Sequence, residues 1–297
     1  MKLELFKHQK KAIEQLKTGS ILRGGVGSGK SLTALGYYFI RECGGGIQGE
    51  IIPMTRPKNL YVITVANKRD KLDWLREAVQ LGISSDKELN TNKIEFIVDS
   101  WNNITKYTDV KNAFFIFDEQ KAIGSGAWSK AFIKIAKQNN WILATATPGD
   151  VWSDYIPVFV ANGFFKNRTD FLSKHAVFNS FTPFPKIDRY IHTEVLERYK
   201  ASLLVEMDYV SKANRNILEM TFRYDHDAYK KVEERWNIYK NVPVKSASEA
   251  CYLFRQVVNS DLSRLEGLLQ LIKKHGKIIV FYNFDYELEI LRNLSHI

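Results

Sequence analysis

The sequence predicts a doubly wound α/β fold, in which helices cover both faces of a parallel β-sheet. Three observations lead to this prediction. Short apolar runs alternate with helix-compatible stretches over about the first 160 of the 297 residues. A glycine-rich loop directly follows the first apolar run. Two later apolar runs end in polar residues, as buried parallel strands do where a sheet carries a site.

The glycine-rich loop GGVGSGKS, residues 24–31, fits the pattern G-x-x-x-x-G-K-[ST] without a substitution. Apolar Ile21 and Leu22 precede it, and the helix-compatible SLTALGYYFIREC follows it. This strand, loop and helix order is what a phosphate-binding loop requires, and it favours such a loop over an ordinary glycine-rich turn. Backbone N–H groups and the helix N-terminus would hold a nucleoside triphosphate. The predicted nucleotide-binding residues of the loop are Gly25, Val26, Gly27, Ser28, Gly29, Lys30 and Ser31.

The residues expected to act on the phosphates lie at the end of the loop and at the end of a second apolar run. Lys30 would reach the β and γ phosphates, and the Ser31 hydroxyl would contact a magnesium ion. The run AFFIFDEQ, residues 113–120, ends in two carboxylates. Asp118 would hold the magnesium, directly or through water, and Glu119 would orient the attacking water. Alone, two acids after a strand would more often cap a helix, but downstream of a phosphate loop a catalytic pair is favoured.

A third apolar run, WILATATP at residues 141–148, ends in Thr145 and Thr147 before a proline. The order of phosphate loop, DE pair and T-A-T-P resembles motifs I, II and III of the superfamily-two (DEAD/DEAH-like) helicases and translocases. The likeness is strongest to the Swi/Snf branch and to compact helicases of that type encoded by bacterial viruses. It implies a RecA-like fold and a motor that hydrolyses ATP with magnesium on DNA. In that motor, Thr145 and Thr147 would couple the γ phosphate to the nucleic acid.

Further segments carry the same resemblance. FKHQKKAIEQL, residues 6–16, resembles the segment ahead of motif I, which would make Gln9 the residue that reads the adenine edge; a plain amphipathic helix is the alternative. In LYVITVANKRDKLDWLREA, residues 60–78, Trp74 and Glu77 match the W-x-x-E of motif Ia in the Swi/Snf branch. Lys68 and Arg69 follow that strand, where family members contact the nucleic-acid strand that they track.

The chain is expected to have three parts. Residues 1–160 would form the first RecA-like ATP-binding lobe, residues 161–220 a linker with a helical insertion, and residues 221–297 an incomplete second RecA-like lobe. Within the last part, residues 251–284 resemble the opening helices of the second lobe and its motif IV strand. Motifs V and VI, with the arginine finger, have no counterpart. The resemblance therefore implies a truncated second lobe, and it leaves open whether this chain hydrolyses ATP by itself.

The charge balance favours a polyanionic partner. Forty-three Lys and Arg against thirty-three Asp and Glu give a net charge of +10 and a pI near 9.3. The helix-compatible AWSKAFIKIAKQ, residues 127–138, places lysines on one face and apolar side chains on another. Lys130 and Lys134 are therefore predicted to contact nucleic acid, with a solvated face over the core as the alternative.

Composition and spacing exclude several other classes. Two cysteines cannot build a disulfide framework, and no cysteine or histidine has the spacing of a metal site. No serine or cysteine lies in a recognisable nucleophile motif. Neither a signal core nor an apolar run of membrane-spanning length is present. We therefore expect a soluble, cytoplasmic protein without a membrane partner.

The predicted function is that of an ATP-dependent DNA helicase or translocase. ATP binding would close the cleft between its two lobes, and this closure would drive movement on DNA. The alternative is a non-catalytic module that binds DNA, or a replication or recombination partner, under nucleotide control. A phosphate-loop kinase or GTPase would lack both the T-A-T-P strand and the adenine-side glutamine.

Overall fold

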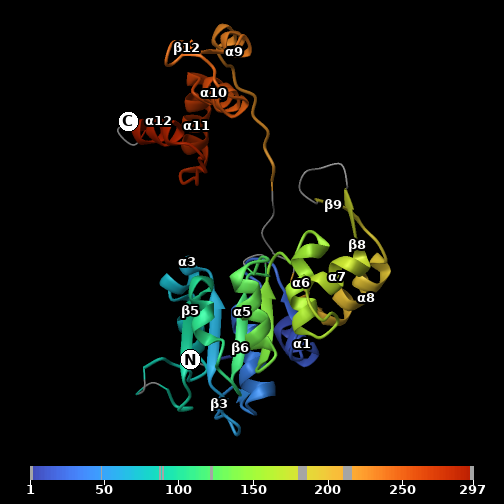
Figure 1. Ribbon diagram of the computed structural model, residues 1–297. Coiled ribbons are helices and arrows are strands. Elements are labelled where there is room, and N and C mark those ends of the chain that lie inside the picture. Colours follow the sequence, from blue (N-terminus) through green and yellow to red (C-terminus); the bar gives the residue numbers. More distant parts are fainter. Residues whose placement is uncertain are drawn as a thin grey trace. The chain divides into compact units, whose positions relative to one another are not determined.

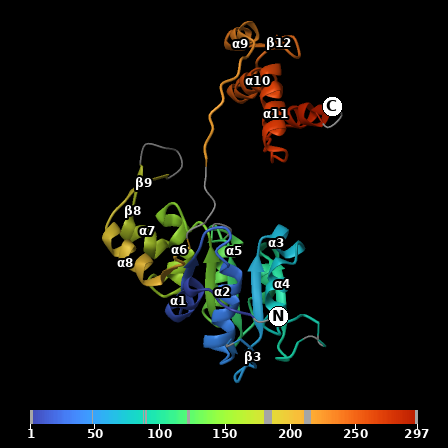
Figure 2. The same ribbon diagram turned by 180° about the vertical axis from the view of Figure 1, so that it is seen from behind.

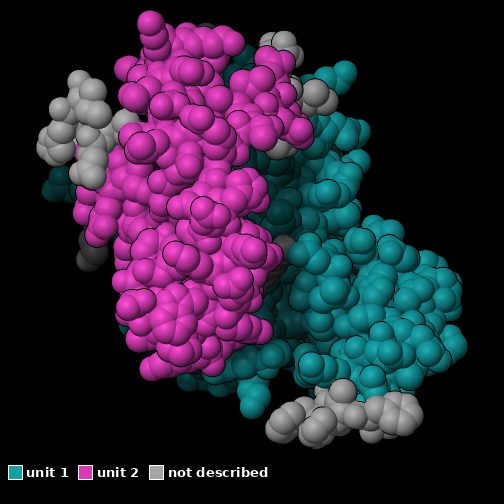
Figure 3. Space-filling view, turned by 90° about the horizontal axis from the view of Figure 1, so that it is seen from above, with its two compact units in different colours: residues 1–213 teal, residues 214–297 magenta. Residues whose placement is uncertain are grey.

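The computed structural model describes residues 3–47, 49–86, 88, 90–120, 123–179, 186–209 and 216–294. The chain divides into two compact units, residues 1–213 and 214–297, which Figure 3 shows in different colours. The expected boundaries at residues 160 and 220 stay a prediction.

A six-stranded parallel sheet in the order β10-β1-β7-β6-β4-β5 forms the centre of the first unit (Figure 1). Strands β4 and β6 are buried along their whole length, as strands of a parallel sheet are when helices cover both faces. This arrangement confirms the predicted doubly wound α/β class. The strands are β1 Ile21–Arg23, β4 Leu60–Thr64, β5 Phe96–Ser100, β6 Phe114–Asp118, β7 Asn140–Thr145 and β10 Leu204–Glu206.

Helices pack on both faces of this sheet. Figure 2 shows α1 (Lys7–Gln15), α2 (Lys30–Tyr37) and α4 (Asp73–Val79) on one face. On the other face lie α5 (Ala127–Ala136), α6 (Trp152–Ala161) and the 3-10 segment Trp101–Tyr107 (Figure 1). Each face has its own buried apolar cluster, because alternate strand side chains point to opposite sides. The short helix α3 (Ala66–Asp70) follows β4, and the π-helical turn Tyr38–Glu42 continues α2.

The segment expected to be a linker contributes to the first unit. It contains α7 (Arg168–His175), the antiparallel pair β8 (Ala176–Asn179) and β9 (Lys186–Tyr190), α8 (Thr193–Leu203) and β10. Strand β10 pairs in parallel with β1, with Ile21 opposite Leu204. The sixth strand of the sheet therefore comes from this segment. A further small hairpin, β2 (Gly46–Ile47) with β3 (Ile51–Ile52), precedes β4.

The second unit is mainly helical in its described part. Side chains of Ser246 and Asp261 accept hydrogen bonds from the first-turn N–H groups of α10 and α11, which fixes where these helices begin. A small core joins α9 and α10 through Val232, Leu253 and Val257. The elements are α9 (His226–Glu233), β11 (Trp236–Asn237), β12 (Val242–Pro243), α10 (Ala247–Asn259), α11 (Leu262–His275) and α12 (Asp285–Leu294).

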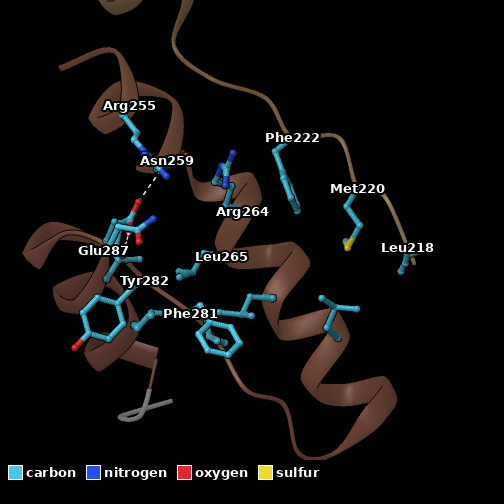
Figure 4. A pocket seen from close by; sticks show the side chains of 16 residues that line it. Leu218, Met220, Phe222, Arg255, Asn259, Arg264, Leu265, Phe281, Tyr282 and Glu287 are labelled. Carbon is cyan, nitrogen blue, oxygen red and sulfur yellow. Dashed lines mark hydrogen bonds between the residues drawn. The ribbon is translucent and has the colours of Figure 1, made fainter. Parts of the chain in front are cut away.

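The expected motif IV strand is not formed. Residues 277–283 run between α11 and α12 without strand pairing, and Ile279 and Phe281 are 83% and 92% exposed. A buried strand needs a neighbour for its N–H and C=O groups, and the described part of this unit offers none beside the run. The run borders a pocket of about 620 Å³. Figure 4 shows Phe281 and Tyr282 of the run in this pocket, together with Met220, Phe222 and Leu265.

Within the described residues, no helix has both the length and the apolar composition that crossing a membrane requires.

Candidate nucleotide site

The glycine-rich loop connects β1 to α2 at the carboxyl edge of the sheet. Gly27 and Gly29 have φ angles of +81° and +76°, which glycine adopts without the steric cost that a side chain adds. The Ser28 N–H donates to the Gly25 carbonyl at 3.2 Å, which closes the turn, and α2 begins at Lys30. The loop thus has the tight turn before a helix N-terminus that suits a phosphate group.

Gln9 on α1 is buried against this loop. Its Nε2 donates to the Gly29 carbonyl at 3.3 Å, and its Oε1 accepts from the Phe6 N–H at 2.8 Å. A Cβ atom at Gly29 would lie 2.5 Å from Gln9 Nε2, so this contact requires glycine. Both ends of the amide are therefore engaged within the protein. A role for Gln9 in reading adenine stays a prediction.

Asp118, the last residue of β6, is a buried carboxylate with several donors. Its Oδ2 accepts from Thr64 Oγ1 at 2.7 Å and from Trp74 Nε1 at 3.3 Å. The indole of Trp101 donates to the Asp118 main-chain carbonyl at 2.8 Å. A buried charge is tolerated when it is paired and hydrogen-bonded, and these donors hold the carboxylate in one orientation.

Glu119 turns out of β6 with a left-handed backbone, φ +73°, which is unusual for a residue with a side chain. Its N–H still donates to the Ala144 carbonyl on β7 at 2.9 Å. Such backbone conformations cost about 1–3 kcal/mol and occur mainly at functional sites. The consequence here is that the Glu119 side chain borders the same cavity as the glycine-rich loop.

The ammonium group of Lys68, on α3, contacts the carboxylates of both Asp118 and Glu119. Its Nζ is 3.0 Å from Asp118 Oδ2 and 3.0 Å from Glu119 Oε1. Burial alone would lower the pKa of Lys68, but the charges and hydrogen bonds of Asp118 and Glu119 outweigh it and raise that pKa. Lys68 is therefore a charged partner of the DE pair in this structure, and its contact with nucleic acid stays a prediction.

Lys30 shares this electrostatic environment. Its pKa is lowered mainly by burial and next by the positive charge of Lys68, while Asp118 and Glu119 act in the opposite direction. Its Nζ donates to the Gly25 carbonyl at 3.4 Å, within the loop. Two lysines and two carboxylates thus meet beside the loop.

A cavity of about 580 Å³ opens between the loop, α3 and α4, which is within the range of small-molecule sites. It lies wholly in the first unit. Its lining residues are Val26, Gly27, Lys30, Ser31, Lys68, Asp73, Arg76, Glu77, Gln80, Glu119 and Ala146.

The donor set at this cavity fits magnesium with phosphate ligands. The Ser31 hydroxyl and the carboxylates of Asp118 and Glu119 supply oxygen, which magnesium prefers, and this ion usually takes only one or two protein carboxylates. No cluster of three acidic, histidine or cysteine side chains suited to a metal occurs in the described part of the chain. A magnesium ion shared with phosphate oxygens fits this donor set.

Thr145 ends β7 beside the glycine-rich loop. Its carbonyl accepts from the Gly24 N–H at 3.2 Å, and its Oγ1 accepts from the Thr147 N–H at 3.2 Å. Thr145 is buried, whereas Thr147 is exposed. The structure therefore brings three of the predicted motifs to one edge of the sheet.

The other predicted nucleic-acid residues lie away from this cavity. Arg69 is paired with Asp70 and Asp99. Lys130 and Lys134 are exposed on α5, and Lys134 pairs with Asp109 at 2.8 Å. None of these three cations lines the cavity, and their role stays a prediction.

Several contacts of the site carried no recognised signal in the sequence. Thr64 and Trp101 hold Asp118 but lie in other segments, although Thr64 ends the strand next to β6. The residues after β10 also reach the loop: the Met207 N–H donates to the Arg23 carbonyl at 2.8 Å. Ser28 Oγ lies 3.8 Å from the Met207 sulfur. Only the pairing of β10 with β1 brings these residues together.

No family model matches the sequence, and no curated protein resembles it significantly. Among solved structures, a SWI2/SNF2 ATPase core of Sulfolobus solfataricus in complex with double-stranded DNA is similar, with a TM-score of 0.54 and 16% identity, over 99% of this chain and 70% of that chain. A SWI2/SNF2 ATPase core domain of the same organism has a TM-score of 0.50 and 14% identity, over 99% and 68% of the two chains. These similarities confirm the RecA-like fold of the parallel sheet.

The contact between Gly29 and Gln9 predicts an unequal response to two glycine substitutions. Gly163 has φ +80° and open space around it, so Gly163→Ala should cost only backbone strain, about 1–2 kcal/mol. Gly29→Ala should cost more, because a Cβ there also displaces the buried Gln9 amide from its hydrogen bonds. Urea unfolding of both variants measures the difference. In a Gln9→Ala background the excess cost of Gly29→Ala should disappear. Equal destabilisation by the two glycine substitutions in the wild type, or an excess that persists without Gln9, would contradict this role for the contact.

Proposed function

We propose that the protein is a nucleic-acid-dependent ATPase, an ATP-dependent DNA helicase or translocase. The observation that carries the proposal is that the glycine-rich loop and Glu119 line one cavity, with the buried Asp118 joined to Glu119 through Lys68. The RecA-like fold, shared with SWI2/SNF2 ATPase cores, supports it. One of those cores was solved with double-stranded DNA, and the net charge of +10 of this chain is compatible with such a partner.

In the proposed mechanism, the loop and the first turn of α2 bind the triphosphate of ATP through backbone N–H groups. Lys30 contacts the β and γ phosphates. Ser31 and Asp118 would hold a magnesium ion, which when bound would neutralise part of the phosphate charge. Thr64 and Trp74 keep the Asp118 carboxylate oriented through their hydrogen bonds.

Glu119 orients the attacking water in line with the γ phosphate and accepts its proton. The bond between the γ phosphorus and the bridging oxygen then breaks, and ADP and inorganic phosphate are released. The left-handed backbone at Glu119 supports this role, because it directs the side chain to the cavity instead of along β6. A positioned base of this kind contributes about 10²–10⁴-fold to the rate.

Coupling to DNA is proposed to run through the end of β7. The Thr145 carbonyl is bonded to the Gly24 N–H of the loop, and the Thr145 hydroxyl to the Thr147 N–H. A shift of the loop on nucleotide hydrolysis would therefore reach the exposed Thr147 in two steps. Adenine recognition by Gln9 and contacts of Lys68, Arg69, Lys130 and Lys134 with DNA belong to the same proposal.

A second candidate function is a nucleotide-controlled binding module without turnover. The run at residues 277–283 favours it, because the described part of the second unit does not build a sheet there. In that case ATP would bind at the same cavity, and DNA or a replication or recombination partner would respond to its presence.

Replacing the proposed base should separate ATP binding from hydrolysis. Glu119→Gln should keep nucleotide affinity within about twofold and lower turnover by about 10²–10⁴-fold. Lys30→Ala should lose binding as well, because the phosphates lose their ammonium partner. Calorimetric ATP titration and phosphate release measure the two effects, and Glu14→Gln, an exposed change on α1, is the control. Near-normal turnover in Glu119→Gln would refute the assigned role.

Removing the exposed Thr147 hydroxyl at the end of this relay should uncouple ATP turnover from DNA, although the bond from the Thr147 N–H to Thr145 Oγ1 can still form. Thr147→Ala should leave ATP affinity nearly unchanged and abolish the stimulation of ATP turnover by DNA. Thr169→Ala, an exposed change on α7, should behave like the wild type. Equal losses of ATP affinity and DNA stimulation would show that Thr147 supports the nucleotide site instead of relaying its state.

A further inference from the structure

Lys68 occupies the position that a metal ion would need at the DE pair. Its ammonium contacts Asp118 through both carboxylate oxygens, at 3.0 and 3.3 Å, and Glu119 at 3.0 Å. The phosphate-loop lysine, Lys30, makes neither contact at hydrogen-bond distance in the described structure. One flexible side chain from α3 therefore neutralises both carboxylates of the proposed active site.

Other donors already contact one oxygen of Asp118. Thr64 and Trp74 donate to its Oδ2 from inside the fold. Asp118 is almost fully buried, whereas the Lys68 side chain is 37% exposed and borders the cavity. The side of the carboxylate that Lys68 contacts is thus the side open to a ligand. A divalent cation entering from the cavity would meet this ammonium first, and like charges repel strongly where solvent is partly excluded.

The same cavity also offers Lys68 a new partner. A triphosphate bound at Lys30 and Ser31 would bring several negative charges into it, and Lys68 lines it beside them. Magnesium alone would have to separate the ammonium from two carboxylates, whereas magnesium with a triphosphate would exchange one ion pair for another.

We propose that Lys68 is a tethered cation that weakens the binding of free divalent metal at the DE pair and yields more readily to metal accompanied by a nucleoside triphosphate. This deepens the proposed function and rests on it for the identity of the nucleotide. Lys68 thereby acts as a regulatory residue that makes metal binding depend on nucleotide.

The test is a titration of the protein with Mn²⁺ in the absence of nucleotide. The electron paramagnetic resonance signal of free Mn²⁺ measures how much of the metal is bound. Lys68→Met keeps the length of the side chain and removes the charge, so it should bind Mn²⁺ at least 10-fold more tightly than the wild type. Lys71→Met, an exposed change near the end of α3, should not differ from the wild type. Unchanged Mn²⁺ affinity in Lys68→Met would overturn the proposal.

A double variant locates the metal site. Lys68→Met combined with Asp118→Asn should lose the added affinity, because the carboxylate that binds the metal is gone. If the gain persists in the double variant, the metal binds elsewhere and the proposal fails.

Labelling of the wild type gives a readout that does not depend on a variant's folding. Acylation of Lys68, followed by mass spectrometry and normalised to Lys71, should be slow without metal and rise as Mn²⁺ saturates the protein. Constant Lys68 reactivity across a saturating titration would overturn the proposal.

The last measurement adds nucleotide to the Mn²⁺ titration. A non-hydrolysable ATP analogue should tighten Mn²⁺ binding at least 10-fold more in the wild type than in Lys68→Met. An analogue that does not bind at all would refute the proposed function and leave the Mn²⁺ result without nucleotide intact. Normal analogue binding with equal tightening in both proteins would refute the role of Lys68 alone.

Discussion

The fixed carboxylate of Asp118 is the constraint on which the site depends. A buried charge is stable only with partners, and its partners come from three elements: Thr64 at the end of β4, Lys68 on α3 and Trp74 on α4. Satisfying Asp118 therefore positions α3 and α4 relative to β6. These helices form one wall of the cavity, and the glycine-rich loop forms the other. Removing a partner would leave a buried acceptor unsatisfied, which costs about 1–3 kcal/mol.

The glycine-rich loop is constrained from both sides of its strand. Strand β1 lies between β7 and β10, so Arg23 pairs with Thr145 on one side and Glu206 on the other. The next residues continue these contacts, Gly24 with the Thr145 carbonyl and Ser28 with the Met207 side chain. A change in the conformation of the loop would consequently alter contacts both at Thr145 and in the segment after β10.

The sequence was sufficient for the fold class and the main residues of the cavity, because both depend on local patterns. A glycine-rich loop between a strand and a helix, and apolar runs ending in polar residues, can be recognised without long-range information. Strand β10 was missed, since its three residues, Leu204–Glu206, carry little apolar signal. The run at residues 277–283, in contrast, was predicted to be a strand and is not one. It is apolar enough to be a buried strand, but its composition cannot supply the neighbouring strand that pairing requires. The contacts of Lys68 with the DE pair were also out of reach, because a side-chain position depends on how separate segments pack.

The central claim is that the cavity around the glycine-rich loop and the DE pair hydrolyses ATP in response to DNA. It is tested most directly by the magnesium-dependent ATP turnover of the 297-residue chain, with and without single-stranded and duplex DNA, beside Lys30→Ala. The account predicts turnover that DNA stimulates and that Lys30→Ala abolishes. No turnover under any of these conditions, or turnover that DNA and Lys30→Ala leave unchanged, would contradict it.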